Sequence, residues 1–378
     1  YETAIFGKWH LNGMDWEVPE NWTGASGSFP KQQGFNHGFA GKEDPHVTRE
    51  LRINTQKHPG DYFTVDGKPL GTMKGYSSQL ISNGAMDWLE NRREPNKPFF
   101  LYLPYDAVHI RISSPDVFEQ MYQTDDPNKD FYYANVTHLD HEIGRLLDYM
   151  EEARLDENTI VIFASDNGPD IERVHYACWK CLGTSYPLYG QKQQLFEGGI
   201  RVPGMVRWPD RIRPGISDEP NGFVDVLPTL CEAAGIEPPT DRELDGTSIL
   251  HHLTEGVPVD RTKPLYWQYE YPAAFEMKGE LYNRRFDGQQ RIKGPKPSVS
   301  IRDGDYVLLG LQEERFQMPT DFLLYNVVED VEQQHDLSTT EPNRLERMKQ
   351  KMANLYQSAN EERLHIEAKV QELYPPGN

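Results

Sequence analysis

Short apolar runs alternate along the chain with longer stretches of helical periodicity. Four runs have the composition of strands, at residues 3–10, 98–105, 158–168 and 202–208. Apolar residues recur every three or four positions over 76–93 and 130–153, which predicts two amphipathic helices. A third predicted helix, 223–235, ends at Gly235, a residue suited to a helix C-terminus. Because strands and helices alternate, the pattern predicts an α/β layered domain.

Two of these expectations can be stated residue by residue. The runs 98–105 and 158–168 are almost continuously apolar, so each predicts a buried strand. In the helix over 130–153 the apolar positions form a stripe that we expect to face the core. The stripe consists of Tyr133, Val136, Leu139, Ile143, Leu146, Leu147 and Met150.

The amino-acid composition of the chain changes near residue 257. Aromatic, charged and turn residues become frequent, and 298–311 reads as a hairpin around Asp303 and Gly304. A strand over 321–330 and a charged helix over 342–373 follow. We therefore predict two domains: a larger α/β domain over 1–256 and a smaller α+β domain, with an antiparallel sheet and a terminal helix, over 257–378.

Composition narrows the class of protein. The chain has 378 residues, of which 37% are hydrophobic, so it can bury a sizeable core. No apolar run approaches the ~20 residues that span a bilayer. The net charge of −20 argues against nucleic acid as a partner, because a nucleic-acid binder needs a basic footprint. An anionic substrate would have to be held by a local cluster of cations.

The three cysteines point to no zinc site. Cys178 and Cys181 form a single C-x-x-C, Cys231 stands alone, and a structural zinc site takes about four ligands. The pair could be a redox motif, a disulfide or two ordinary loop cysteines, and the sequence leaves these alternatives open.

Reactive side chains follow several of the predicted strands. In an open α/β sheet, ligands bind beyond the carboxyl ends of the strands, where such side chains would meet. Three groups stand at strand ends or just after them, and a fourth lies in a loop that precedes a strand: Lys8 with His10, His109, Asp166 with Asn167, and Lys192.

Together these residue types indicate one chemistry. Lysines and histidines can hold a small tetrahedral oxyanion, and a histidine can protonate a leaving oxygen. Asp166 and Asn167 offer hard oxygen ligands, which suit Ca²⁺ or Mg²⁺ better than zinc. The combination predicts metal-assisted hydrolysis of an anionic ester. Each group also has a plainer interpretation, as a surface residue or a turn former, and the Gly-Gly of EGGIRVP can serve backbone geometry alone.

Three segments give the chain a family resemblance. GKWHL at 7–11, FASDNGP at 163–169 and LYGQKQQLFEGGIRVPGMVRWP at 188–209 resemble the signatures of type I sulfatases, in the alkaline phosphatase superfamily. The resemblance implies a mixed central sheet flanked by helices. It also implies that Lys8 and His10 contact the nucleophile, that Lys8, His109 and Lys192 hold the sulfate, and that Asp166 and Asn167 bind Ca²⁺, with Mg²⁺ as the alternative.

The chain departs from the family pattern at the nucleophile. These enzymes use a formylglycine made from the Cys or Ser of a C-x-P-S-R or S-x-P-S-R motif, which this chain lacks, together with the paired aspartates of the first strand. We expect both to lie upstream of Tyr1, in a part missing from this sequence. The histidine loop also reads AVHI where the family usually has Pro before His, and Tyr189 stands where Arg is common. Because it lacks the nucleophile motif and the first strand, the chain alone is predicted to be inactive and poorly folded.

The resulting prediction is a sulfuric ester hydrolase whose substrate is a sulfated small molecule, with a sulfated saccharide favoured. One alternative is a phosphodiesterase or phosphonate hydrolase of the same superfamily. Another is a non-catalytic sulfate-binding protein that has lost its nucleophile. The family is commonly exported, so we expect a periplasmic or secreted protein.

Overall fold

The computed structural model divides into two compact units. It describes residues 1–9, 30–41, 63–65, 68–69, 75–109, 112–169, 183–269, 281–284, 291–294, 297–311 and 316–373. The N-terminal unit comprises Tyr1–Asp156 with Glu172–Gly183, and the C-terminal unit comprises Glu157–Ile171 with Thr184–Asn378. These units follow contacts within the fold, and the predicted division between residues 256 and 257 stays a prediction.

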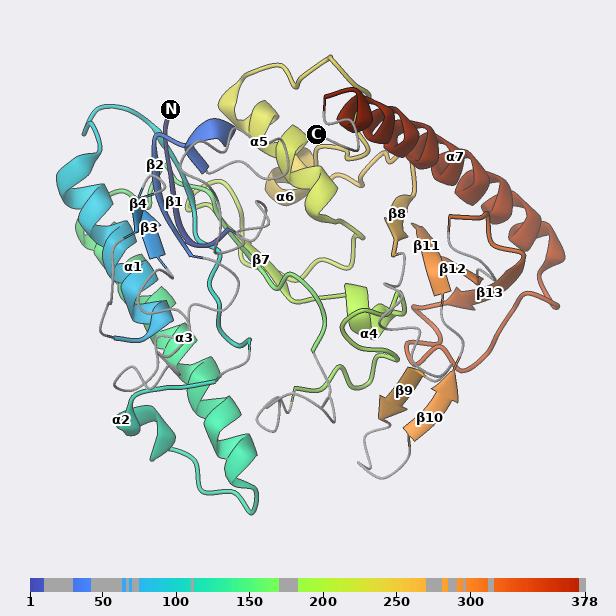
Figure 1. The fold of residues 1–378 in the computed structure, drawn as a ribbon, viewed down its shortest axis with the longest axis horizontal. Helices are drawn as coiled ribbons and strands as arrows, with labels where there is room; N and C mark the ends of the chain where they lie inside the picture. Colours follow the sequence, from blue (N-terminus) through green and yellow to red (C-terminus); the bar gives the residue numbers. More distant parts are fainter. Residues whose placement is uncertain are drawn as a thin grey trace. The chain divides into compact units, whose positions relative to one another are not determined.

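A mixed sheet organises the N-terminal unit. Its strand order is β4-β3-β2-β1-β5, and β1 runs parallel to both of its neighbours, whereas β2-β3 and β3-β4 are antiparallel (Figure 1). The short helix η1, Pro30–Gln33, precedes β2. The strands are β1 Glu2–Lys8, β2 His37–Gly41, β3 Phe63–Val65, β4 Lys68–Pro69 and β5 Phe99–Tyr102.

Helix α1 packs on β1 and helix α3 packs on α1, and both helices lie where the periodicity predicts them. The elements are α1 Ser77–Asp87, the π-turn η3 Trp88–Arg92, α2 Asp116–Glu119 and α3 Pro127–Glu152. Gly84 of α1 lies so close to the ring of Phe6 that an added Cβ would meet it at 2.8 Å. The helices α1 and α3 run side by side (Figure 1). Ser82 Oγ of α1 donates to the carbonyl of Glu142 at 3.2 Å.

The buried face of α3 differs from the predicted stripe. Tyr133 and Val136 are exposed, while the buried residues are Ala134, Asn135, His138, Glu142, Leu146 and Met150. Two of the polar side chains on this face have clear partners. His138 stacks on the ring of Phe118 at 5.0 Å, and Glu142 accepts from Arg145 at 2.6 Å. Satisfied polar groups can replace apolar ones on a buried helix face.

The expectation of two fully buried strands was wrong. In β5 the alternate residues Phe100 and Tyr102 are exposed, and in the C-terminal unit Ile162 of β6 is exposed as well. Within the described residues β5 pairs only with β1, and β6 pairs only with β7. A strand with one neighbour is covered less completely than a central strand, so its alternate side chains reach solvent.

The first part of the C-terminal unit is an irregular α/β segment. Strands β6, Val161–Ala164, and β7, Gly204–Arg207, form an antiparallel pair. The helical elements are α4 Glu197–Ile200, η4 Phe223–Asp225, α5 Val226–Ala234 and α6 Leu250–Glu255. Helix α5 ends as predicted, because Gly235 adopts the left-handed conformation with φ 67°.

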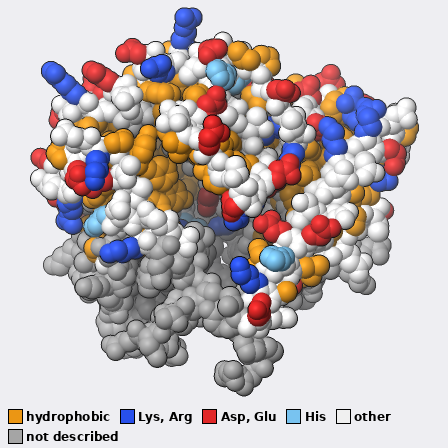
Figure 2. All heavy atoms as spheres, turned by 90° about the horizontal axis from the view of Figure 1, so that it is seen from above, with side chains coloured by type: hydrophobic (Ala, Val, Ile, Leu, Met, Phe, Trp, Pro, Cys, Tyr) orange, Lys and Arg blue, Asp and Glu red, His pale blue; other side chains and the backbone are white. Residues whose placement is uncertain are grey.

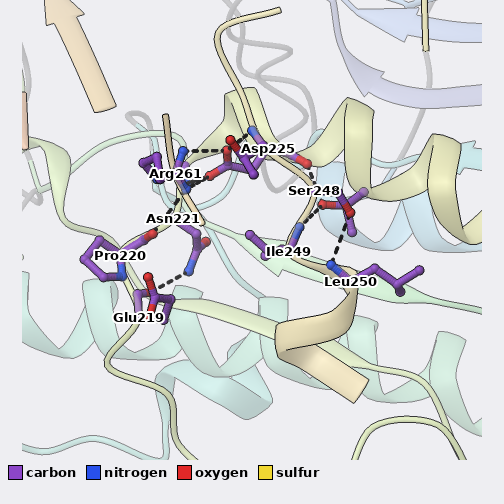
Figure 3. A network of polar contacts seen from close by, with 11 residues as sticks. Glu219, Pro220, Asn221, Asp225, Ser248, Ile249, Leu250 and Arg261 are labelled. Atoms are coloured by element: carbon purple, nitrogen blue, oxygen red, sulfur yellow. Dashed lines mark hydrogen bonds and ion pairs between the residues drawn. The ribbon is translucent and has the colours of Figure 1, made fainter. Parts of the chain in front are cut away.

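A buried ion pair ties this segment together (Figure 3). Both carboxylate oxygens of Asp225 accept from the guanidinium of Arg261, at 2.9 and 2.8 Å, and the backbone amides of Gly222 and Thr247 complete the set at 2.8 Å each. The side chain of Asp225 is 1% exposed and that of Arg261 is 13% exposed. One carboxylate thus joins η4 to the chain before α6 and to the chain before β8.

An antiparallel sheet of order β13-β12-β11-β8 completes the unit. Long helix α7, Pro342–Leu373, has the bounds that the sequence predicts and packs Met348, Met352 and Tyr356 against one face of this sheet. The predicted hairpin is confirmed, with Gly304 at φ 59° in its turn. The strands are β8 Leu265–Gln268, β11 Pro297–Asp303, β12 Tyr306–Leu311 and β13 Asp321–Asn326, and a separate antiparallel pair consists of β9 Leu281–Arg284 and β10 Arg291–Gly294.

Charged side chains of both signs are present on the described surface. On the described part of the face drawn in Figure 2, Lys and Arg side chains lie among Asp and Glu side chains. Among the described residues, no helix is both long and apolar enough to cross a membrane.

Candidate functional site

In the N-terminal unit, β1 and β5 carry two of the predicted site residues at one edge of the sheet. Lys8 is the last residue of β1, and His109 lies in the loop that follows β5. Because the two strands are parallel neighbours, their carboxyl ends point the same way. His109 is held in a tight turn, in which its amide donates to the carbonyl of Asp106 at 2.7 Å.

The end of β1 touches the backbone of the histidine loop. The amide of Lys8 donates to the carbonyl of Pro104 at 2.8 Å. Gly7 makes this approach possible, because a Cβ at this position would lie 2.1 Å from the same carbonyl oxygen and the φ of 132° disfavours other residues. The glycine of the GKWHL motif therefore sets the distance between the lysine strand and the histidine loop.

A tyrosine fastens the same loop to the helices. The hydroxyl of Tyr105 lies 2.7 Å from Ser82 Oγ, which also reaches the carbonyl of Glu142 in α3. Burial raises the pKa of Tyr105 to about 12, so its hydroxyl stays protonated at neutral pH. Trp9 is buried against Ile5 and Phe35. His10 lies outside the described residues.

In the C-terminal unit, the turn after β6 carries Asp166 and Asn167. Ser165 Oγ donates to the carbonyl of Asn167 at 2.9 Å, and Asn167 Nδ2 donates to the carbonyl of Gly168 at 2.8 Å. The amide nitrogen of Asn167 is thereby used within the turn, and its Oδ1 is the end left to accept a ligand. Asp166 is exposed, and the described residues offer it no ion pair.

The turn lies against the loop that carries Lys192. The amide of Lys192 donates to the carbonyl of Pro169 at 2.9 Å, and the amide of Gly168 donates to the carbonyl of Gly199 in α4 at 2.9 Å. Two backbone hydrogen bonds thus join the turn that carries Asp166 and Asn167 to the segment that carries Lys192 and α4. Among the residues that the structure describes, no carboxylate pairs with Lys192 or, in the N-terminal unit, with Lys8.

Two glycines of α4 allow this close contact. A Cβ on Gly198 would lie 2.4 Å from the carbonyl oxygen of Gly190, and one on Gly199 would lie 2.0 Å from that of Gln194. The Gly-Gly pair therefore serves backbone geometry, which was one of the interpretations left open by the sequence. It does so at the point where the lysine loop folds back on itself.

The donor set suits a hard cation only in part. Asp166 supplies a carboxylate and Asn167 an amide oxygen, whereas Ca²⁺ takes about six to eight oxygen ligands. Among the residues that the structure describes, no group of three or more His, Cys, Asp or Glu side chains could hold a metal ion. The two residues fit a metal such as Ca²⁺ in kind and fall short of it in number.

The structure thus groups the predicted site residues by unit. Lys8 and His109 share a sheet edge in the N-terminal unit, and Asp166, Asn167 and Lys192 share a junction of two loops in the C-terminal unit. Cys178 and Cys181 lie outside the described residues, and Cys231 is buried and free. Sequence reasoning missed Glu197, a buried residue directly before the Gly-Gly pair, and its partner Arg302. A charged residue flanking the two glycines was the available signal.

Comparison with solved structures places the fold in a known class. A crystal structure of Ps i-CgsB in complex with k-i-k-neocarrahexaose matches with a TM-score of 0.69 at 20% sequence identity, over 93% of this chain and 72% of that chain. The chain therefore shares the α/β fold of that structure, and its mixed sheet and flanking helices agree with the predicted fold class.

A family model then identifies the chain more closely. The Sulfatase model matches residues 1–236, and the chain belongs to the sulfatase family. A second model, described as the C-terminal part of N-sulphoglucosamine sulphohydrolase, matches residues 187–286. The second match includes the lysine loop and helix α4.

Curated relatives agree with the family and are longer than this chain. An uncharacterized sulfatase, YdeN, of Escherichia coli K12 is 27% identical over 370 residues, which are 90% of this chain and 62% of the relative. The N-acetylgalactosamine-6-sulfatase of Canis lupus familiaris is 28% identical over 275 residues, 71% of this chain and 48% of the relative. The chain spans about half to three fifths of the length of these relatives.

Proposed function

We propose that this protein hydrolyses sulfate esters. The observation that carries the proposal is the junction of the Asp166–Asn167 turn with the lysine loop, held by backbone bonds at 2.9 Å in a chain of the sulfatase family. It sets hard oxygen donors and an ammonium group on two segments in direct backbone contact. A cation site beside an anion site is what a sulfate ester requires.

The proposed roles follow from the chemistry of each side chain. Lys192 and Lys8 contribute positive charge to the sulfate oxygens, and this charge matters most in the transition state. His109 is proposed as the acid that donates a proton to the leaving oxygen. For His10 the role proposed from the family resemblance is a hydrogen bond to the nucleophile.

The sulfatase family uses a metal and a formylglycine. The metal proposed for this protein is Ca²⁺, with Mg²⁺ as the alternative. Asp166 and Asn167 would hold it, because carboxylate and amide oxygens are the ligands that both ions prefer. The metal, when bound, polarises the ester oxygens and offsets charge on the attacking group. This chain contains no C-x-P-S-R or S-x-P-S-R sequence, so the nucleophile would have to come from outside Tyr1–Asn378.

A sulfated saccharide is the proposed substrate. Two similar proteins that are named for sulfated sugars support this proposal. They are an N-acetylgalactosamine-6-sulfatase and the N-sulphoglucosamine sulphohydrolase of the second family model. The structural neighbour crystallised with a neocarrahexaose also supports an oligosaccharide. Export to the periplasm or the cell exterior, where such saccharides are met, remains a prediction.

The test is a substrate panel applied to protein made from the complete reading frame that encodes Tyr1–Asn378. The panel contains N-acetylgalactosamine 6-sulfate, N-sulfoglucosamine, 4-nitrophenyl sulfate, and 4-nitrophenyl phosphate with its phosphodiester. We expect sulfate release, fastest from a saccharide. Turnover of the phosphodiester alone would favour the phosphodiesterase alternative, and sulfate binding without turnover would favour a non-catalytic protein. Turnover of 4-nitrophenyl sulfate without any saccharide would overturn the substrate class.

The isolated 378-residue chain belongs in the same panel. It is expected to release no sulfate, since it carries no formylglycine motif. Sulfate release by this chain alone would contradict the assigned nucleophile chemistry.

A further inference from the structure

Helix α4 is the element on which both halves of the C-terminal site rest. Gly168, next to the Asp166–Asn167 turn, donates to the carbonyl of Gly199, and a Cβ on Gly168 would lie 1.9 Å from the carbonyl oxygen of Gly198. The amide of Gly198 in turn donates to the carbonyl of Tyr189 in the lysine loop at 2.7 Å. A shift of α4 would therefore displace both segments.

Glu197 at the start of α4 is held by the antiparallel sheet. Its side chain is 4% exposed, and Oε2 lies 3.2 Å from a guanidinium nitrogen of Arg302 in β11, whose side chain is 11% exposed. Arg201, in the residues after α4, is half exposed and lies farther away, at 3.5 Å. The amide of Glu197 donates to Gln333 Oε1 at 2.9 Å, so both backbone and side chain are anchored beyond the loop.

An apolar contact fixes the same place. Phe196, the residue before α4, is buried in a cluster with Tyr325 and residues of β12. Val307 and Leu309 face this cluster, while their neighbour Leu308 faces α7 on the opposite side of the sheet. The sheet therefore carries α7 on one face and the lysine loop on the other, and Arg302, paired with Val307, shares the face of the loop.

The buried ion pair between Glu197 and Arg302 is expected to add little to the free energy of unfolding. Burial raises the pKa of Glu197 above its ordinary value, and burial also lowers the pKa of Arg302, although the two charges attract each other. In both groups burial is the largest cause of the pKa shift, ahead of the attraction between the two charges. Replacing buried ion pairs by apolar residues is often neutral or stabilising, so such a pair is better explained by the geometry that it fixes.

We propose that Arg302 is a positioning residue of the site: through Glu197 it holds α4, and thereby the lysine loop and the Asp166–Asn167 turn, in one geometry. This inference extends the proposed function and rests on it, because the site that Arg302 positions is the proposed sulfate-ester site. It assigns to the C-terminal sheet a part in catalysis, although Arg302 itself is not placed in contact with substrate.

The variants separate this role from general stability. Arg302→Met and Glu197→Gln remove one partner each, the double variant removes both, and Arg302→Lys keeps the charge. The matched control is Lys351→Met. Lys351 pairs with Asp303, the next residue of β11, at 2.6 Å, and this pair is more exposed, with side chains 47% and 37% exposed. An exposed pair of this kind should not affect the site.

Two readouts are needed, hydrolysis of a sulfate ester and amide hydrogen exchange. Arg302→Met is expected to lower kcat roughly 10- to 100-fold, the scale of a small misplacement of reacting groups. The double variant should lose no more than Arg302→Met, because both act through one contact, and Arg302→Lys should recover part of the activity. Exchange should rise in 161–169 and 188–200 and stay unchanged in β12, β13 and α7.

Wild-type kcat in Arg302→Met, additive losses in the double variant, or exchange that rises throughout the C-terminal sheet would each overturn the proposal. The last result would show that Arg302 only stabilises the sheet. If no variant and no wild-type protein hydrolyses a sulfate ester, the proposed function fails, and exchange in 161–169 and 188–200 still decides whether Arg302 positions these two segments.

Discussion

The backbone amide of Lys8 donates a hydrogen bond of 2.8 Å to the carbonyl of Pro104, a residue 96 positions farther along the chain. This bond ties the end of the lysine strand to the loop that carries His109. It exists only because Gly7 presents no side chain to the same carbonyl. A motif residue without chemistry of its own thus sets the spacing of two residues proposed to act on the substrate.

Replacing Gly7 by alanine should destabilise the N-terminal unit. The new Cβ would lie 2.1 Å from a backbone oxygen, and the φ of 132° is strained for alanine. We expect a loss of roughly 2–6 kcal/mol, the sum of a strained backbone and an overpacked contact. The measurement is the urea midpoint of unfolding, with tryptophan fluorescence as the signal.

Gly144→Ala is the matched control for that variant. An added Cβ at Gly144, within α3, has nothing within 4 Å. Alanine should stabilise the helix by up to about 1 kcal/mol. A Gly7→Ala protein as stable as the wild type would show that the loop yields, and that Gly7 does not set its distance.

Arg261→Ala should weaken the C-terminal unit, because it leaves the carboxylate of Asp225 buried without its cation (Figure 3). Breaking a buried pair on one side costs about 3–5 kcal/mol. The unfolding free energy from urea titration checks this value. Arg242→Ala is the control, since Arg242 pairs with Asp241 while its side chain is 67% exposed, and it should change stability by less than about 1 kcal/mol. Equal losses in both variants would contradict the assigned burial.

The stability of the protein should depend on the ionisation of Glu197. Burial raises the pKa of Glu197 above the ordinary value of 4.5, so the folded state favours the protonated carboxyl. Its contribution is therefore fully present below pH 4.5 and is lost as the pH rises through the raised pKa. Glu197→Gln lacks this titration.

Thermal unfolding midpoints from pH 4 to pH 7, compared between the wild type and Glu197→Gln, give the measurement. The wild type should lose stability relative to the variant as the pH rises. The trend should persist at high salt, because buried groups are screened little. A wild type that gains on the variant with rising pH would reverse the sign and refute the argument.

Loss of the proposed anion-binding cations should reduce turnover far more than loss of other lysines. Lys8→Ala, His109→Ala and Lys192→Ala are each expected to lower kcat by about 10²–10³, the effect of removing one preorganised electrostatic group. Steady-state hydrolysis of a sulfate ester by the complete protein measures this. Lys97→Ala and Lys369→Ala remove exposed lysines, one in each unit, and should leave kcat unchanged. Site variants as active as these controls would remove the proposed roles.

Calcium should stabilise the protein through the Asp166–Asn167 turn. At a Ca²⁺ concentration of 100 times the Kd, a ligand that binds only the folded state adds about 2.7 kcal/mol. Differential scanning fluorimetry of the complete protein, in EDTA and then in excess Ca²⁺, should show an increase in the unfolding temperature that Asp166→Ala abolishes. Asp241→Ala, at an exposed pair, should retain the increase. An equal response in Asp166→Ala would place the cation elsewhere.

Local elements of this protein could be predicted from sequence because their causes are local. Helix α7 has its predicted bounds, helix α5 stops at Gly235, and the hairpin turns at Gly304, since periodicity and positive φ are properties of neighbouring residues. The strand-end pattern also predicts a site made of Lys8, His10, His109, Asp166 and Asn167, with Lys192 from a loop before a strand, and the roles of these residues stay predictions.

Other features depend on contacts between distant residues, and only the tertiary structure could decide them. The buried face of α3 includes His138 and Glu142, because the ring of Phe118 from α2 covers His138 and Arg145 of α3 pairs with Glu142. Phe100 is exposed because β5 pairs with one described strand, and strand order is not written in the apolar run itself. The anchoring of Glu197 by Arg302 joins residues 105 positions apart. Hydrophobic patterning records which residues avoid water, whereas packing decides which neighbour shields each of them.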